Sequence, residues 1–457
     1  MATAPASLRG PGSFPAADAA ELPGPGAAAG EMGDAEFLAT ARQIFRDAAA
    51  RLSQAASRQD ARPLAEDLVA AWAEDQARGT GPLASPGTQA ALAQAVLDEQ
   101  FGLGALQPYV DDPRVENIDV NGPQQVLITL RDGRRLAGRP VAGSDSDLME
   151  MVRTWGLREG QTPREFSVTN PLLNAALNQA GVRLSAVMSV TPEVHVSVRC
   201  HRLVDITLED LCGPGYGTLT PGLAHFLTCA VRAYRNIIVT GGVDAGKTTL
   251  LRALAAAIEP GERVATLESE YELYLHQMPA RHRDVVPMEA RQANAEGAGG
   301  ISLYALIPQA LRLNPRRVIV GEVRDREVVP MLEAFNTGHR GSLCTMHADG
   351  ADEVFNRILM LARRGDLALP PEVIHLYVGM ARPFVVHITK DPATHQRYVT
   401  EVIEVLPPGD GAQPARNHVW VPGPDGRAAP GHSLSPQALQ DLLGAGFNPD
   451  VLAGALP

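Results

Sequence analysis

The most informative stretch of the sequence is a glycine-rich segment that ends in a lysine and a threonine. Residues 241–248 read Gly-Gly-Val-Asp-Ala-Gly-Lys-Thr and fit the pattern G-x-x-x-x-G-K-[ST] at every fixed position. In such a loop the glycines let backbone amides surround a phosphate, and the following helix directs its positive end at it. We expect the Lys247 ammonium to reach the β- and γ-phosphates of a nucleotide and the Thr248 hydroxyl to hold Mg²⁺. The predicted nucleotide-binding residues of this segment are Gly241, Gly242, Asp244, Ala245, Gly246, Lys247, Thr248 and Thr249.

Two features of this loop are particular to the chain. Lysine and arginine together number 40, and Lys247 and Lys390 are the two lysines, which leaves 38 arginines. One of these rare lysines stands where a compact ammonium must enter between phosphates, which argues against a chance match; Lys390 has no role that the sequence suggests. Asp244 places a carboxylate in a loop built for anions. It either points outward, pairs with an arginine, or weakens nucleotide binding.

Acidic residues follow two of the predicted strands. The apolar strand at residues 318–320 leads into Glu322, as a Walker B strand does, and the strand at 263–267 leads into Glu268, with Glu272 four residues later. Ligands of open α/β sheets collect at the carboxyl ends of the strands, so these acids are expected to converge on the phosphate loop. We expect Glu322 to coordinate Mg²⁺ through water and all three acids to serve hydrolysis.

A histidine ends a further predicted strand. His347 follows the segment 342–346 and would reach the same edge of the sheet. On the residues alone, a histidine in this position is more often packed or solvated than catalytic.

The elements that must position these groups alternate between strand and helix beyond Gly213. Predicted helices at 223–234, 248–258 and 303–313 alternate with strands at 236–240, 263–267, 318–320 and 342–346. This alternation is typical of a parallel sheet and assigns the chain to the α/β class.

The region before this α/β domain is of another kind. Apolar residues at helical spacing predict one amphipathic helix from residue 36 to 52 and a second after Pro63, followed by a linker at 79–87. Residues 126–130 and 134–136 predict a hairpin around Asp132-Gly133, residues 148–155 a helix, and 194–199 a half-buried strand. Arg199 on that strand faces solvent or another domain. The predicted domains are a disordered tail (1–35), a helical extension (36–88), a mixed α+β domain (89–212), the α/β domain (213–406) and a mostly disordered tail with one short helix (407–457).

Composition excludes several classes of protein. No run of 18 apolar residues is present, and the N-terminus lacks the pattern of a signal peptide, so we expect a cytoplasmic protein without a membrane span. Four widely spaced cysteines without a C-x-x-C pair argue against a disulfide framework or a zinc site. A formal net charge of −12 disfavours sequence-independent binding of duplex DNA, which depends on basic residues.

Taken together, these motifs resemble the type II/type IV secretion ATPase family, and within it the tight-adherence (Flp) pilus assembly branch. The resemblance covers residues 102–405, about two-thirds of the chain. Its most specific parts are the segments 314–327 and 337–348, which read NPRRVIVGEVRDRE and TGHRGSLCTMHA. The resemblance implies a RecA-like P-loop ATPase domain behind an N-terminal domain, with a nucleotide between them, in a homo-hexameric ring.

The resemblance also implies roles for individual residues. Glu268 and Glu272 become an acidic box, Glu322 the Walker B acid and His347 the residue of a histidine box. Arg291 is expected to serve the γ-phosphate, and Arg199 and Arg202 to close over the nucleotide from the N-terminal domain.

The chain departs from the family pattern at two places and lacks a third motif. The usual loop is Gly-Gly-Thr-Gly-Ser-Gly-Lys, whereas this one carries Val243, Asp244 and Ala245; Ser269 stands where an aspartate usually follows the first acid. Both changes put the catalytic rate in doubt. The tetracysteine zinc motif of the general secretion ATPases is absent, which favours the pilus and conjugation branches.

The expected function is therefore that of a Mg²⁺-dependent ATPase at the inner face of the cell membrane. It would bind ATP and dock on an inner-membrane platform protein to power pilus assembly or protein secretion. A conjugation motor that moves DNA and a weakly hydrolysing, nucleotide-gated scaffold remain as alternatives.

Overall fold

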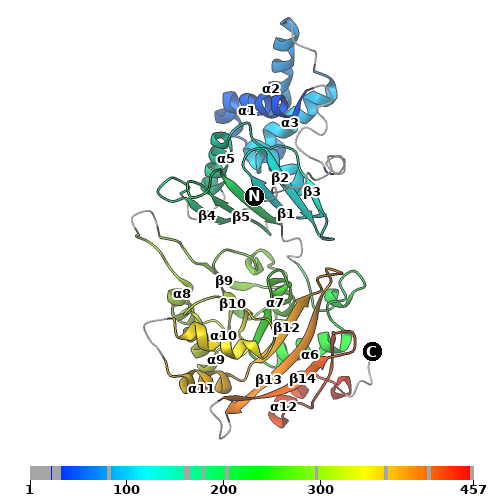
Figure 1. Ribbon diagram of the computed structural model, residues 1–457, viewed down its shortest axis with the longest axis vertical. Coiled ribbons are helices and arrows are strands. Elements are labelled where there is room, and N and C mark those ends of the chain that lie inside the picture. The colour runs from blue at the N-terminus through cyan, green and yellow to red at the C-terminus, as the bar shows by residue number, and fades with distance from the viewer. Residues whose placement is uncertain are drawn as a thin grey trace, which may run out of the picture. The chain divides into compact units, whose positions relative to one another are not determined.

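A computed structural model describes residues 22, 32–79, 84–158, 165–177, 181–200, 205–293, 297–364, 369–408 and 413–452. The chain divides into two compact units, Met1–Arg202 and Leu203–Pro457. Figure 1 shows both units, which are described separately below. None of the described helices combines the length and the apolar character that a membrane crossing requires.

The first unit combines helices with an antiparallel sheet. Its helices are α1 (Asp34–Leu52), α2 (Arg58–Arg78), α3 (Pro86–Phe101), α4 (Gln107–Asp111) and α5 (Asp145–Arg158). Its strands, in the order β3-β2-β1-β6-β5-β4, are β1 (Val115–Asn121), β2 (Gln125–Leu130), β3 (Arg135–Ala137), β4 (Leu172–Ala176), β5 (Val182–Val187) and β6 (His195–Cys200). A single core of buried residues runs from the helices into the sheet.

The predicted amphipathic helices are present, with different limits. α1 buries Phe37, Ala41, Ile44 and further residues at steps of three and four, as the apolar stripe requires. α2 begins at Arg58, ahead of Pro63, because Ser57 caps it by accepting a hydrogen bond from the amide of Asp60. The linker expected at 79–87 ends earlier than predicted, since Ser85 caps α3 in the same way.

The second unit is built on a nine-stranded sheet. Its strands are β7 (Ile237–Gly241), β8 (Arg263–Glu268), β9 (Asp284–Glu289), β10 (Arg317–Val323), β11 (Leu343–His347), β12 (Phe384–Lys390), β13 (Arg397–Pro408), β14 (Pro414–Pro422) and β15 (Ala428–Pro430). The strand order is β15-β14-β13-β12-β7-β11-β10-β8-β9. Strands from β12 to β9 pair in parallel, and β13, β14 and β15 extend the sheet in antiparallel fashion.

Helices cover both faces of this sheet (Figure 1). They are α6 (Pro221–Arg232), α7 (Lys247–Ala255), α8 (Leu303–Leu311), α9 (Val328–Asn336), α10 (Glu353–Ala362), α11 (Pro371–Ala381) and α12 (Pro436–Gly444). On β7, Ile237 and Val239 join a core with α6, α7 and α12, whereas Ile238 joins a second core with α8 to α11. Burial on both faces explains why the central strands are continuous apolar runs, and it gives the three-layer α/β fold of a RecA-like domain.

The expected boundary at 212/213 and the expected tail from 407 onward both need correction. Ile206, Leu208 and Leu211 pack into the core of the second unit, so that unit begins about ten residues earlier. Residues 414–430 form β14 and β15, and Trp420 is 2% exposed in the same core. The short helix with Ser435 as its cap is present as predicted. The expected disordered tail 1–35 lies almost entirely outside the described residues.

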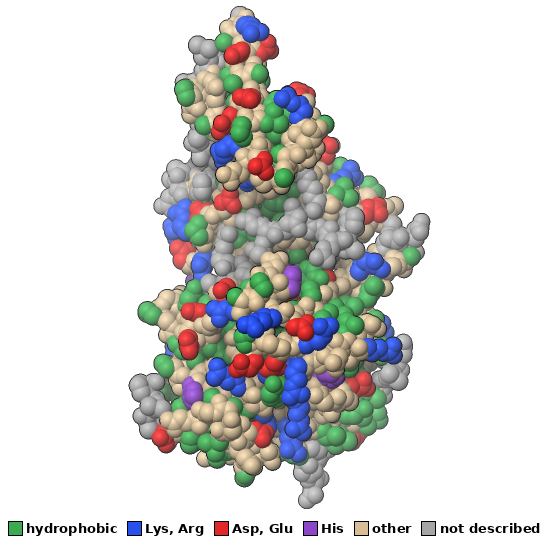
Figure 2. Space-filling model, turned by 180° about the vertical axis from the view of Figure 1, so that it is seen from behind, with side chains coloured by type: hydrophobic (Ala, Val, Ile, Leu, Met, Phe, Trp, Pro, Cys, Tyr) green, Lys and Arg blue, Asp and Glu red, His purple; other side chains and the backbone are tan. Residues whose placement is uncertain are grey.

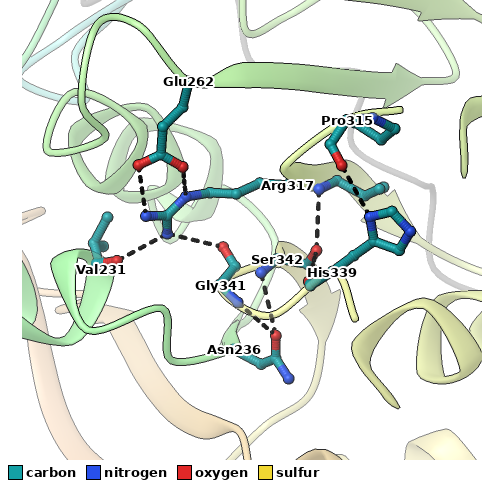
Figure 3. A network of polar contacts seen from close by, with 9 residues as sticks. Val231, Asn236, Glu262, Pro315, Arg317, His339, Gly341 and Ser342 are labelled. Carbon is teal, nitrogen blue, oxygen red and sulfur yellow. Dashed lines mark hydrogen bonds and ion pairs between the residues drawn. The ribbon is translucent and has the colours of Figure 1, made fainter. Parts of the chain in front are cut away.

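The amino ends of the parallel strands are tied together by buried polar groups (Figure 3). Arg317, the first residue of β10, is 1% exposed and donates from Nε and Nη2 to both carboxylate oxygens of Glu262 at 2.7 and 3.0 Å. Its Nη1 donates to the carbonyls of Val231 and Gly341. Asn236, just before β7, accepts from the amides of Gly341 and Ser342. These bonds fix the starting points of β7, β10 and β11 against one another.

Candidate nucleotide site

The carboxyl ends of four neighbouring parallel strands carry the residues that the sequence singled out. Gly241 at the end of β7 pairs in register with His347 at the end of β11. β10 follows next with Glu322, and β8 ends at Glu268. The expected convergence on one edge is therefore present, because the parallel sheet places all of these strand ends side by side.

Glu322 stands at an irregularity of β10. Between Val320 and Val323, three steps along β10 correspond to two steps along β11, which is a β-bulge. Bulges of this kind redirect a side chain at the end of a strand. Gly321 within the bulge has Glu268 against it, so that an added Cβ would lie 3.1 Å from Cγ of Glu268. The glycine thus lets two acidic strand ends lie close together.

The phosphate loop runs from β7 directly into α7. Gly246 adopts φ +96°, a conformation that favours glycine, and α7 begins at Lys247. The Lys247 ammonium donates to the carbonyls of Gly241 and Gly242 at 3.1 and 2.7 Å. Its Nζ also lies 3.2 Å from Nδ1 of His347. In this arrangement the side chain folds back over the loop that precedes it.

His347 links this lysine to the acid of β10. Its Nε2 lies 2.8 Å from Oε1 of Glu322, and Nη2 of Arg324 lies 2.5 Å from the other carboxylate oxygen. Burial raises the pKa of Glu322, but His347 and Arg324 outweigh it and lower that pKa to about 2. Glu322 is therefore ionised at neutral pH, as a ligand of a cation or of a polarised water must be. Lys247, His347 and Glu322 form one continuous chain of contacts.

Thr248 contacts Glu272, one of the two acids at and after the end of β8. Its hydroxyl donates to Oε2 of Glu272 at 2.8 Å. Glu268, which is 2% exposed, accepts from the amides of Glu272 and Leu273, each at 2.8 Å. Glu268 thereby holds the segment that carries Glu272 and presents Glu272 to the loop.

Asp244 points out of the loop. Its carboxylate accepts from Nζ of Lys390 at 2.6 Å and from Nη2 of Arg397 at 2.9 Å. Of the three expectations for this residue, pairing with an arginine is confirmed, and the lysine without an assigned role is its second partner. Ala245 beside it is buried, and Thr249 is half-buried in the first turn of α7.

The three predicted arginines belong to different parts of the chain, and one of them is outside the described residues. Arg291, just after β9, has an exposed side chain whose Nε donates to the carbonyl of Gly299 at 2.6 Å. Arg199 lies on β6 of the first unit and is half-buried. Arg202 lies outside the described residues. The structure therefore brings together the predicted residues of β7, β8, β10, β11 and α7.

Several residues at the site were missed by sequence reasoning. Arg252 on α7 is 2% exposed and donates from Nε to the carbonyl of Glu272 at 2.9 Å. Burial lowers the pKa of Arg252 to about 10, against the opposing effect of Glu268. Arg324, Lys390 and Arg397 were missed as well. For Arg324 the signal was available, since it follows the Walker B acid by two residues; Lys390 and Arg397 are brought near only by the fold.

The oxygen donors at this edge suit Mg²⁺. Thr248, Glu272 and an ionised Glu322 offer the hard oxygen ligands that this cation prefers. Within the described ranges no group of three or more histidine, cysteine or acidic side chains forms a complete metal cage. Magnesium usually binds through one or two protein groups together with substrate phosphates and water, so the residues present fit that mode.

Comparison with known proteins identifies a family and several relatives. The family described as type II/IV secretion system protein matches residues 166–374. A putative conjugal transfer protein of Mycobacterium tuberculosis is 32% identical over 351 residues, which are 76% of this chain and 94% of that protein. The type IV secretion system protein VirB11 of Brucella suis is 28% identical over 313 residues, 63% of this chain and 84% of that protein.

Two solved structures are similar at lower identity. The crystal structure of the Brucella suis VirB11 ATPase with sulphate shows 24% identity, covers 65% of this chain and 95% of that chain, and has a TM-score of 0.35. The structure of the Legionella pneumophila ATPase DotB shows 17% identity and a TM-score of 0.49, and the match covers 66% of this chain and 79% of that chain. On the identity and coverage of its curated relatives, the chain belongs to the type II/IV secretion system protein family, which includes ATPases of type IV secretion systems.

Proposed function

We propose that this chain is an ATPase that hydrolyses ATP with Mg²⁺ at the carboxyl edge of the sheet in its second unit. The observation that carries the proposal is the contact chain from Lys247 through His347 to Glu322. Through β11, it joins the lysine of the phosphate loop after β7 to an ionised acid on β10, the proposed Walker B strand. That combination provides phosphate binding and activation of a nucleophile in one place.

Each residue has a distinct task in this proposal. Backbone amides of 241–246 and the Lys247 ammonium bind the β- and γ-phosphates, and the ammonium exchanges its loop carbonyls for phosphate oxygens. Thr248 and Glu322 would hold Mg²⁺, Glu322 through water, and the cation would supply positive charge that neutralises the charge of the phosphates. Glu322 polarises the attacking water, and His347 orients Glu322. Glu268 and Glu272 are proposed to serve hydrolysis as well. Arg291 is proposed to bind the γ-phosphate, and Arg199 and Arg202 to bind the nucleotide.

The proposal extends to assembly and cargo. A homo-hexamer docked on a membrane platform protein at the cytoplasmic face would convert hydrolysis into motion that drives pilus assembly or protein secretion. Relatives named as type IV secretion system proteins support the secretion part. Rigid-body motion of the two units around bound nucleotide would be the mechanical step.

A DNA-transfer motor is the second candidate, because the Mycobacterium tuberculosis relative and a relative from Sinorhizobium fredii carry conjugal transfer in their names. The net charge of −12 counts against it. On the face drawn in Figure 2, cationic and anionic side chains of the second unit intermingle rather than forming a stretch of one sign. DNA that stimulates ATP turnover in a salt-dependent manner would favour this candidate over a protein-only motor.

The scaffold alternative loses part of its basis. It drew on Asp244 as a charge that repels phosphate, yet this carboxylate is paired with two cations. Ser269 still replaces the usual second acid, but Glu272 contacts the Thr248 hydroxyl at 2.8 Å.

Phosphate release by the purified full-length chain tests the proposal. We expect turnover that requires Mg²⁺ and ceases with a chelator, together with a hexamer in sedimentation analysis. Nucleotide binding and ring assembly without phosphate release would support the scaffold instead. Absence of nucleotide binding would exclude both.

A further inference from the structure

The phosphate loop packs against a neighbouring hairpin at three positions, Gly241, Asp244 and Gly246. This hairpin consists of the end of β12, the start of β13 and the turn between them. At Gly241, an added Cβ would collide with the carbonyl oxygen of Ile388 on β12. At Gly246, it would lie 3.1 Å from Cδ of Arg397 on β13. Between these two points, Asp244 makes the polar contacts.

Side-chain and main-chain hydrogen bonds join Asp244 to the hairpin. Lys390 donates to one carboxylate oxygen at 2.6 Å, and Nη2 of Arg397 donates to the other at 2.9 Å. Nε of Arg397 donates to the main-chain carbonyl of Asp244, also at 2.9 Å. All three side chains are about one-quarter exposed. One acid on the loop is therefore held by two cations from two different strands, through both its side chain and its backbone.

The backbone at Asp244 has a conformation that needs such support. Its φ is +59°, in the left-handed region, which aspartate tolerates better than most residues but less well than glycine. With this backbone the carboxylate leaves the inner side of the loop and faces the hairpin. The contacts thus keep a negative charge away from the position of the phosphates while they hold the curve of the loop.

We propose that Lys390 and Arg397 are positioning residues that hold the phosphate loop in its nucleotide-binding shape through Asp244. This inference rests on the proposed nucleotide site. It gives the contacts of Asp244 with Lys390 and Arg397 a structural task, which is to hold the loop, and not only the task of neutralising the charge of Asp244. The second reading, in which Asp244 acts on phosphates only through its charge, makes the opposite prediction for the same variants.

The sign of the effect on KM separates the two readings. Asp244→Asn keeps the size of the side chain and removes its charge. If Asp244 only repelled phosphates, this variant would bind ATP more tightly. If Asp244 anchors the loop, the variant loses both ion pairs and its amide can accept from only one of the two cations, so we expect KM for ATP to rise about 3- to 10-fold with kcat within about 2-fold.

A double-mutant cycle provides the second criterion. Lys390→Met should raise KM by a similar factor, and Lys390→Arg should restore it because the pair is kept. The double variant Asp244→Asn with Lys390→Met should resemble Asp244→Asn alone, since that variant already breaks the ion pair with Lys390. Arg232→Met is the matched control, because it removes one exposed cation at the end of α6, next to Val231 of the network at the amino end of the sheet. Its KM should equal that of the wild type.

The test uses the full chain, with steady-state turnover and equilibrium binding of a fluorescent ADP analogue as two readouts. A KM for Asp244→Asn at or below the wild-type value overturns the inference, as does an additive double variant. If the wild type binds the analogue but does not hydrolyse ATP, the proposed hydrolysis fails, and the same cycle measured by binding still decides this inference. If it binds no nucleotide, both are overturned.

Discussion

The two ends of the parallel sheet in the second unit use polar groups in opposite ways. At the amino end, Arg317 is 1% exposed and makes four hydrogen bonds to Glu262 and two carbonyls (Figure 3). At the carboxyl end, the Glu322 and His347 side chains are 19% and 35% exposed. Groups at the amino end are satisfied by fixed partners, whereas groups at the carboxyl end contact one another and solvent.

Groups that stabilise the fold and groups that can bind a ligand therefore lie at opposite ends of the same strands. β10 begins at Arg317 and leads to Glu322, and β11 begins just after Ser342 and ends at His347. Removing one member of a saturated buried pair leaves a charge without a partner, which costs free energy of folding. Exposed groups that contact one another can exchange those contacts for a ligand. The most family-specific segments, 314–327 and 337–348, therefore each contain a residue that stabilises the amino end of the sheet and a residue of the candidate site at its carboxyl end.

The largest expected effect is at the carboxyl end. Lys247→Ala should lower ATP turnover by about 10³-fold, because it removes positive charge where the transferring phosphoryl group needs it. The melting temperature should change little compared with that loss. Phosphate release and a thermal melt of the same preparation check both parts. Measurable turnover near the wild-type rate would refute the assignment of the loop.

At the amino end, Arg317→Met should have the reverse profile. We expect the free energy of unfolding to fall by about 3 kcal/mol, because Glu262 loses its partner in a largely buried place. Urea denaturation measures this loss. The double variant Arg317→Met with Glu262→Gln should recover part of it. At a temperature where the single variant remains folded, its kcat should stay close to the wild-type value; a loss of kcat as large as that of Lys247→Ala would break the comparison.

Glu322→Gln tests the acid of the carboxyl end. It should keep nucleotide binding and lower kcat by about 10²-fold, since a neutral amide polarises water poorly. Comparison of equilibrium nucleotide binding with single-turnover hydrolysis separates the two effects. Loss of binding together with hydrolysis would instead assign Glu322 a structural role.

The smallest expected effect is a pH dependence of stability at Glu322. Its pKa is lowered from 4.5 to about 2, so the ionised form stabilises the folded state fully above pH 4.5. That contribution should disappear as the pH falls from 4.5 towards 2. The wild type should exceed Glu322→Gln in free energy of unfolding by about 1–3 kcal/mol at pH 6, with a smaller gap at pH 3. Denaturation at several pH values measures the gap, and a constant gap would contradict the ion-pair account.

Local pattern was sufficient to predict much of the carboxyl end. The strand, glycine loop and helix around Lys247 are contiguous in sequence, and apolar strands that end in an acid identified Glu268 and Glu322. Parallel pairing then brings these ends together without further information. The ion pairs of Asp244 were beyond such reasoning, because its partners lie about 150 residues further along the chain, on β12 and β13.

The C-terminal strands show the same limit in another form. Residues 414–422 read PARNHVWVP, in which three polar residues precede Val-Trp-Val and a proline stands at each end, so the local pattern does not establish a strand. They form β14 because β13 offers a pairing edge, and because Val419 and Trp420 reach the core of the second unit. Tertiary context overrides local propensity here. The amino-end network was missed for the same reason, since it joins residues from 231 to 342.

The most direct test of the contrast between the two ends is the shift in melting temperature on addition of Mg²⁺ and ATP. A ligand that binds the folded state raises its stability by mass action. The account predicts a clear upward shift for the wild type, a shift of similar size from a lower starting temperature for Arg317→Met, and almost none for Lys247→Ala from a nearly wild-type starting temperature. Equal shifts for the wild type and Lys247→Ala would contradict it.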